Sequence, residues 1–162
     1  MERTYITAWR ITYKNAAKAA GGALIPFAFL RVPVLTKVTS NMCSDIMKAY
    51  GYEQLKGIAT FAGVATGAAL GVVVANEILE KIPGLGTAAA SASTALLHLG
   101  TGVFMISACE LLKTDQITDE QLQNEAWCKS FTGALSSKAG DMICRLIRGQ
   151  SPIEFAYEAF TS

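Results

Sequence analysis

Residues 57–109 read GIATFAGVATGAALGVVVANEILEKIPGLGTAAASASTALLHLGTGVFMISAC and say more about the architecture than any other stretch of the chain. They form two long apolar segments of mostly small residues, separated by the short charged connector 76–81. Glycines recur every four residues over 63–71, so a helix here would carry one smooth stripe without side chains. Such a stripe lets another backbone approach closely, as in helices that pack in lipid or in tight oligomers. The stretch therefore predicts a hydrophobic helical hairpin that packs through its glycines.

The glycines predicted to form this helix-packing or oligomer interface come from both segments of the hairpin. Three lie on the stripe of the first segment, and two open the second segment. They are Gly63, Gly67, Gly71, Gly84 and Gly86.

The remainder of the chain is also helical in pattern, and no stretch alternates with a period of two between hairpin turns. Pro33 should end a short apolar piece, Gly51 should cap a helix, and Gly149 should stop one. Residues 118–121 form a capping box, and Ser151 with Pro152 should open the tail helix. An all-α bundle around the central hairpin is therefore predicted. The expected helices are 4–20, 34–50, 52–79, 87–112, 118–148 and 152–160.

Length and composition indicate one helical domain, residues 1–162. Hydrophobic residues make up 51% of the chain, charged residues 17%, and the mean hydropathy is +0.33. Net charge is +1 and implies no partner, but residues 1–56 hold eight of the 14 Lys and Arg residues and three of the 13 Asp and Glu residues. Residues 1–56 are therefore net basic, and residues 57–162 are net acidic.

The four cysteines lack C-x-x-C spacing and lie in apolar helical surroundings. Buried, reduced thiols are therefore favoured over disulfides, which indicates a reducing compartment. No secretory signal is visible, because the first apolar run, residues 19–30, follows a polar helix and contains Pro26.

Two readings of the hairpin stay open. Residues 58–75 are 18 uncharged residues, about 27 Å of helix against a hydrocarbon core of about 30 Å, so they are only just long enough to span. Residues 83–109 carry no formal charge, but 86–95 are almost all Ala, Ser, Thr and Gly and would gain little from lipid contact. The placement of Lys and Arg is compatible with a hairpin whose two ends stay cytoplasmic. The alternative is a hairpin buried inside a soluble assembly.

A search for chemistry argues against an enzyme. His98, the single histidine, sits among leucines and suits a core position better than a general base. No cluster has metal-ligand spacing, so neither a metal nor a cofactor is expected. Residues 84–89 match G-x-G-x-x-A, but a charged helical segment precedes them where a dinucleotide fold needs a strand.

The N-terminal helix carries the clearest surface pattern. Tyr5, Trp9 and Tyr13 share one line at i, i+4, i+8. This aromatic line either sits at headgroup depth or packs on the bundle, and nucleic-acid binding is not expected because no wider basic surface accompanies it. The predicted membrane-surface or partner face consists of Trp9 with the neighbouring cations Arg10, Lys14 and Lys18.

Several of these segments together resemble one family. They are AAKAAGGALIP at 16–26, the helix end KAYG at 48–51, the glycine-rich helix, and KIPGLGT at 81–87. Across residues 12–112 the chain is similar to the YcjF-type, GTPase-associated domain of unknown function, found in bacterial inner-membrane proteins and fused to Era-like GTPases. The resemblance implies a helical, membrane-associated, GTPase-linked module and supplies no catalytic residues. The chain departs from it in lacking a GTPase domain and in carrying helices of its own at 117–160.

Two functions follow as expectations. The first is a non-enzymatic membrane-associated protein that self-assembles through its glycine stripe at the cytoplasmic face of a bacterial inner membrane. Its partners would be lipids, further copies of itself and a separately encoded GTPase. The second is a soluble, cytoplasmic homo-oligomeric scaffold or adaptor whose hairpin is buried between subunits.

Overall fold

The computed structural model describes residues 3–22, 28–71 and 89–162, and this part of the chain contains eight helices and no strand. The predicted all-α bundle is therefore confirmed. The helices are α1 Thr4–Gly22, α2 Ala28–Tyr50, α3 Lys56–Gly71, α5 Ala89–Lys113, α6 Asp119–Leu122, α7 Glu125–Ser136, α8 Ala139–Ile147 and α9 Ile153–Thr161.

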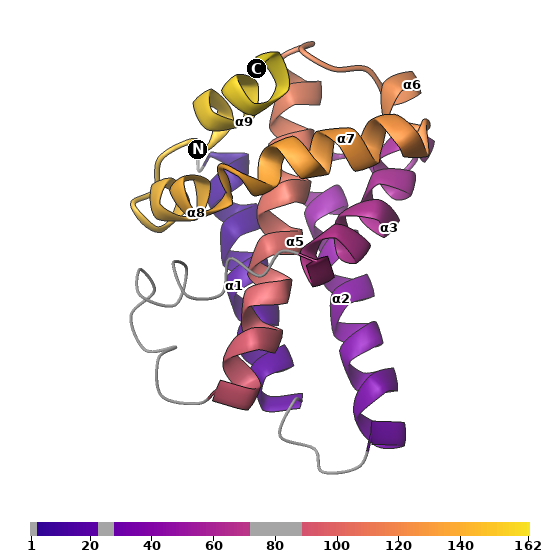
Figure 1. The fold of residues 1–162 in the computed structure, drawn as a ribbon, viewed down its shortest axis with the longest axis vertical. Helices are drawn as coiled ribbons and strands as arrows, with labels where there is room; N and C mark the ends of the chain where they lie inside the picture. The colour runs from indigo at the N-terminus through magenta and orange to yellow at the C-terminus, as the bar shows by residue number, and fades with distance from the viewer. Residues whose placement is uncertain (1–2, 23–27, 72–88) are drawn as a thin grey trace.

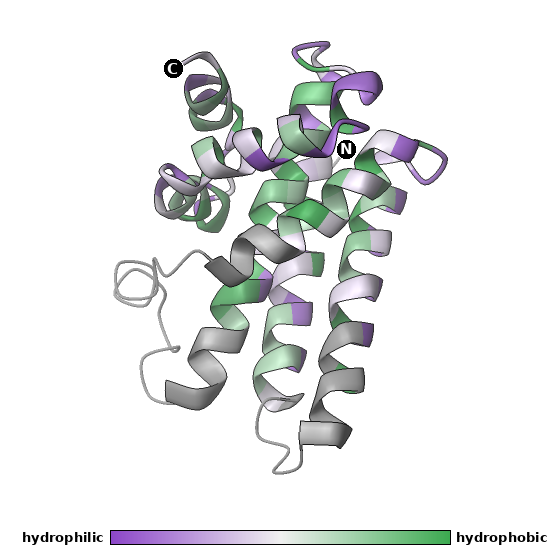
Figure 2. Cartoon of the chain, turned by 45° about the vertical axis from the view of Figure 1, so that its right-hand side comes forward, coloured by the Kyte–Doolittle hydropathy of each residue, from purple (hydrophilic) through white to green (hydrophobic). Residues whose placement is uncertain are grey.

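Helix α5 is the central element of the bundle. It contacts α1, α2, α3, α8 and α9, and it runs beside α1 and α2 along the long axis of the molecule (Figure 1). Helices α7, α8 and α9 cross these long helices near the end that holds both termini. Hydrophilic residues follow the outer side of α2, while its apolar residues face the other helices (Figure 2). The core is therefore built around α5.

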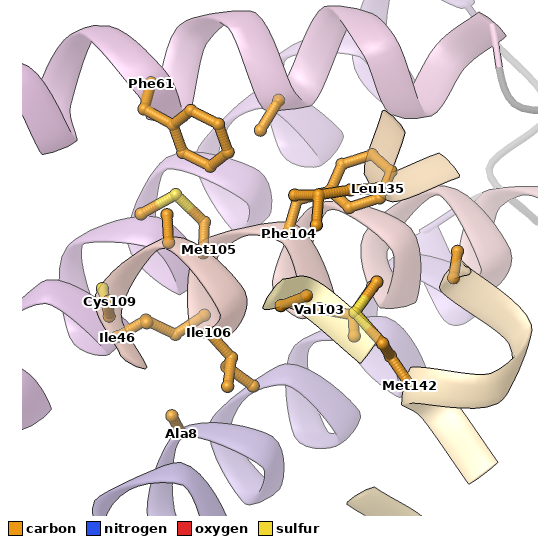
Figure 3. Packing of buried hydrophobic residues seen from close by; sticks show 14 of the residues in the cluster. Ala8, Ile46, Phe61, Val103, Phe104, Met105, Ile106, Cys109, Leu135 and Met142 are labelled. Carbon is orange, nitrogen blue, oxygen red and sulfur yellow. The ribbon is translucent and has the colours of Figure 1, made fainter. Parts of the chain in front are cut away.

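The core brings side chains together from most of the helices. Phe61 of α3 lies near Met105 of α5 in the close view (Figure 3). Within α5, residues 95–113 are long and apolar enough to cross a membrane, and 83% of this segment is buried inside the bundle. The core helix of a soluble protein passes the same test, so this segment alone does not indicate a membrane span.

Three helices end in the same hydrogen-bonded turn. After α2, Gly51 N–H donates to the Lys48 carbonyl at 3.0 Å and Tyr52 N–H to the Met47 carbonyl at 2.9 Å. Gly51 has φ +73°, the left-handed conformation that this Schellman turn requires, and Gly149 after α8 has φ +70°. The predicted helix stops at these two glycines are confirmed. Asp115 occupies the equivalent position after α5, with φ 56°.

The capping box at 118–121 is confirmed, but the long helix expected from it is wrong. Thr118 Oγ1 accepts from Gln121 N–H at 3.2 Å, and Gln121 Oε1 accepts from Thr118 N–H at 2.9 Å. The helix stops at Leu122 because Asn124 adopts an extended conformation and caps α7, its Oδ1 accepting from Trp127 N–H at 3.1 Å. A second break at residues 137–138 separates α7 from α8. Three short helices thus replace the single helix 118–148.

Two further boundaries differ from expectation. Pro33 was expected to end an apolar piece, but α2 runs through it as its sixth residue. Proline at this position removes one internal hydrogen bond, the one its N–H would have donated to the Phe29 carbonyl, and the helix continues through it. Helix α3 begins at Lys56 rather than at Tyr52, and its expected extension to Leu79 lies outside the described residues. The tail helix α9 ends within one residue of its predicted end.

Candidate functional site

The described part of the glycine stripe faces outward. On α3, Ile58, Phe61 and Ala65 are buried against the core, whereas Ala59 and Gly63 are exposed. A Cβ built at Gly63 would meet nothing within 4 Å. We call residues 59 and 63 the α3 outer face. At Gly63, therefore, no helix in the described part of the chain packs on the smooth surface.

The other predicted packing glycines remain predictions. Gly67 and Gly71 belong to α3, and their surroundings lie outside the described part of the chain. Gly84 and Gly86 fall in the segment 72–88, which is also outside it.

Close backbone approach does occur, at two glycines that the sequence pattern did not single out. Gly102 of α5 is buried against Thr12 of α1, whose Cβ would lie 2.8 Å from a Cβ built at Gly102. Gly57, the second residue of α3, lies beside Asp119 of α6, and its N–H donates to Asp119 Oδ1 at 2.9 Å. Gly100 and Gly102 lie within an otherwise bulkier apolar run, which is the one sequence signal that points toward the first contact.

Of the residues predicted to form the surface face of α1, the aromatic one is buried in the core and the three cations are exposed to solvent. Trp9 is 8% exposed and Tyr5 also belongs to the core, so placing Trp9 on the surface face was wrong. Tyr13, in contrast, points away from the bundle and is 49% exposed, so the three aromatics of this line do not share one environment. Packing on the bundle, the alternative left open for this line, holds for the two buried aromatics.

The three cations of this helix lie on its surface. Arg10, Lys14 and Lys18 are exposed, and α1 contains no Asp or Glu. Exposed cations one turn apart make a continuous basic strip, which we call the α1 basic face. A strip of this kind attracts anionic surfaces by long-range electrostatics that salt screens.

His98 is a core histidine. It is 1% exposed, and its Nε2 lies 2.7 Å from Thr39 Oγ1 of α2. The contact joins α2 to α5 and gives the buried ring a polar partner. The prediction of a satisfied core histidine is confirmed.

A second polar pair crosses the same two helices. Glu110 is 6% exposed and its Oε1 accepts a hydrogen bond from Tyr50 Oη at 2.7 Å. Burial, followed by the Glu110 charge and this hydrogen bond, raises the pKa of Tyr50 far above its ordinary value. The Tyr50 phenol therefore stays protonated and donates to the carboxylate over the physiological pH range.

One thiol, that of Cys109, lies close to this pair. The four cysteines are free, and three of them are buried. Burial raises the pKa of Cys43 to about 11 and raises that of Cys109 as well, where the neighbouring Glu110 charge adds to the effect. A thiol with a raised pKa is a poor nucleophile at neutral pH. Within residues 3–22, 28–71 and 89–162, no group of three His, Cys, Asp or Glu side chains is placed to hold a metal ion.

Sequence reasoning missed Tyr50 and Glu110. One signal was present, since Glu110 is the first formal charge after 28 uncharged residues and still belongs to the helical pattern. A carboxylate inside such a pattern needs a partner, but which side chain supplies it depends on how α2 lies against α5.

Comparison with protein-family models, with curated proteins and with solved structures gave no match to this chain. The resemblance to the GTPase-associated domain therefore remains an expectation from the quoted motifs, and the function is argued below from the surfaces just described.

Proposed function

We propose that this protein is a non-enzymatic scaffold that forms homo-oligomers through the α3 outer face and works at an anionic membrane surface. The observation that carries the proposal is the open space that the described residues leave over Gly63, on a helix whose opposite face is packed into the core. A small-residue surface of this kind suits the close approach of a second helix, and a second copy of the chain brings an identical surface to a two-fold contact.

The membrane part of the proposal rests on the α1 basic face. Three exposed cations at one-turn spacing would each contribute on the order of 1 kcal/mol of attraction to anionic headgroups. The resemblance to a GTPase-associated domain adds a separately encoded GTPase as a proposed partner of the assembly. Isolation of the native complex and identification of its subunits by mass spectrometry test that partner.

A second candidate is the same oligomer in solution, acting as an adaptor. One observation favours it: the helix segment 95–113, the one described segment apolar enough to span a bilayer, is already enclosed by the bundle. Inserting it in lipid would require the surrounding helices to give up their contacts with α5.

Self-assembly is tested by Gly63→Leu with Gly133→Leu as the matched control. Both glycines are exposed helical positions at which an added Cβ meets nothing within 4 Å. Leu is a better helix former than Gly, so both variants should fold. We expect Gly63→Leu to lower the assembly mass in mass photometry and Gly133→Leu to leave it unchanged. An unchanged mass for Gly63→Leu would rule out the α3 outer face as the interface.

The site of action is tested by vesicle sedimentation. Changing Arg10, Lys14 and Lys18 together to Gln should weaken binding to anionic vesicles, most strongly at low salt, because screening shortens the range of these charges. The control replaces three exposed lysines elsewhere with Gln, namely Lys37, Lys113 and Lys129. A wild-type protein that stays in the supernatant at all salt concentrations would favour the soluble adaptor.

A further inference from the structure

A groove between α8 and α9 is lined by charged and polar side chains that have no part in the proposed function. It has a volume of about 590 Å³ and is lined by Asp141, Cys144, Arg145, Arg148, Gln150 and Phe155. Residues 141, 144, 145 and 148 follow the i, i+3, i+4, i+7 spacing of one helix face, so α8 presents them side by side. The turn after α8 supplies Gln150, and α9 supplies the aromatic wall.

One guanidinium in this groove is held in place before any ligand arrives. Arg145 forms an ion pair with Glu154 of α9, and its guanidinium carbon lies 5.3 Å from the centre of the Phe155 ring. Only one edge of the guanidinium faces Glu154, through Nη2, so other N–H groups of its five-donor fork remain for a ligand. Less side-chain entropy is lost on binding when the donor is already ordered.

A second guanidinium in the groove is uncommitted. Arg148 is exposed, and its side chain makes no hydrogen bond or ion pair with any residue in the described part of the chain. It caps the C-terminal end of α8, one residue before Gly149. Guanidinium groups recognise oxyanions with paired, directional hydrogen bonds.

A third cation, Arg3, lies near the turn that follows α8, although it does not line the groove. Arg3 Nη1 donates to Tyr5 Oη at 2.9 Å, and Tyr5 Oη donates to the Gly149 carbonyl at 3.4 Å. Asp141, the one carboxylate in the lining, lies two turns away at the start of α8. Positive charge is therefore concentrated at the C-terminal end of the helix, where Arg148 and Gln150 offer donors.

From this arrangement we infer that the α8–α9 groove binds a phosphate group, with Arg148 and Arg145 as the principal donors and Gln150 as a neutral one. The phosphate belongs either to a soluble compound or to the headgroup of a phospholipid, and both present the same oxyanion to the groove. The inference does not depend on the α3 outer face, so failure of the proposed assembly would leave it intact.

The test uses the full-length protein and two probes. Inorganic phosphate is titrated by calorimetry at constant ionic strength with chloride as the balancing anion, and vesicles with and without phosphatidic acid are compared by sedimentation. We expect saturable binding that Arg148→Gln weakens by about tenfold, or ~1.4 kcal/mol. The matched control is Lys129→Gln, which removes an exposed cation outside the groove.

Each outcome is informative. Phosphate binding without a preference for phosphatidic acid identifies a soluble ligand. Binding to phosphatidic acid vesicles that Arg148→Gln weakens and inorganic phosphate displaces identifies a lipid headgroup, whereas vesicle binding that only the Gln triple at Arg10, Lys14 and Lys18 weakens belongs to the α1 basic face and would overturn a lipid ligand for the groove. Equal weakening by Arg148→Gln and Lys129→Gln would show unspecific charge attraction and overturn the inference, as would no binding of either probe by the wild type. Gln150→Glu provides a second variant in which Arg148 is intact, and it should also weaken binding because it places a carboxylate beside the phosphate.

Discussion

Thr12 of α1 packs directly on Gly102 of α5, and this contact sets how closely the first helix approaches the central one. Thr12 is buried, and its hydroxyl donates to the Ala8 carbonyl at 3.0 Å, so its polar atom is satisfied within its own helix. Its methyl group is thereby free to fill the space that glycine leaves on α5. This close helix approach thus lies inside the bundle, at a glycine outside the predicted stripe.

Gly102→Ala should therefore destabilise the protein. The new methyl group would overlap Thr12, and overpacking of this kind typically costs ~1–3 kcal/mol. Gly63→Ala should instead raise the free energy of unfolding by up to ~1 kcal/mol, because its methyl group meets open space and alanine favours the helix. Urea unfolding of the two variants measures both effects. A Gly102→Ala protein as stable as the wild type would mean that α1 shifts freely on α5.

Tyr50→Phe should cost ~1–3 kcal/mol, because it leaves the buried Glu110 carboxylate without its phenol donor. The double variant Tyr50→Phe with Glu110→Leu should recover most of this loss, since it removes both members of the polar pair. A double-mutant cycle by urea unfolding measures the coupling. Additive losses from the single variants would show that the hydrogen bond contributes nothing to stability.

Stability should fall at alkaline pH. The pKa of Tyr50, of Cys43 (to about 11) and of Cys109 are all raised in the folded protein. The unfolded chain then loses protons first, from about pH 8.5 for cysteine and about pH 10 for tyrosine. The stabilisation is therefore complete below pH 8 and declines as pH rises, by at most ~1.4 kcal/mol per pH unit for each group.

Thermal unfolding between pH 7 and pH 11 measures this decline, and Tyr50→Phe serves as the control. The variant lacks the phenol, so its stability should fall less steeply above pH 10 than that of the wild type. Parallel curves for the two proteins would remove Tyr50 as a cause of the alkaline loss.

Trp9→Ala should lower the free energy of unfolding by ~3–5 kcal/mol, the range for truncating a buried aromatic. The Gln triple at Arg10, Lys14 and Lys18 should change it little, because these side chains are exposed. Differential scanning calorimetry compares the two variants with the wild type. An unchanged melting temperature for Trp9→Ala would place its ring outside the core.

Local chemistry explains which predictions from the sequence succeeded. The helix stops at Gly51 and Gly149 and the capping box at Thr118 depend on residues within six positions of one another. The break at Asn124 was missed because its neighbours Gln123 and Glu125 are compatible with a continuing helix, and only the extended backbone at Asn124 shows that it caps a new one.

Sequence alone was enough to predict the all-α class, the helix stops at Gly51 and Gly149, the capping box at Thr118, and the buried position of His98 and of three of the four cysteines. These properties follow from helical periodicity and from hydrogen bonds between near neighbours along the chain. Which face of each helix is buried became visible only in the folded bundle: Trp9 points inward and Gly63 outward, Thr12 packs on Gly102, and Tyr50 lies beside Glu110. Those outcomes depend on the rotation and crossing of helices far apart in sequence, which are set by the packing of the whole core and not by any one segment.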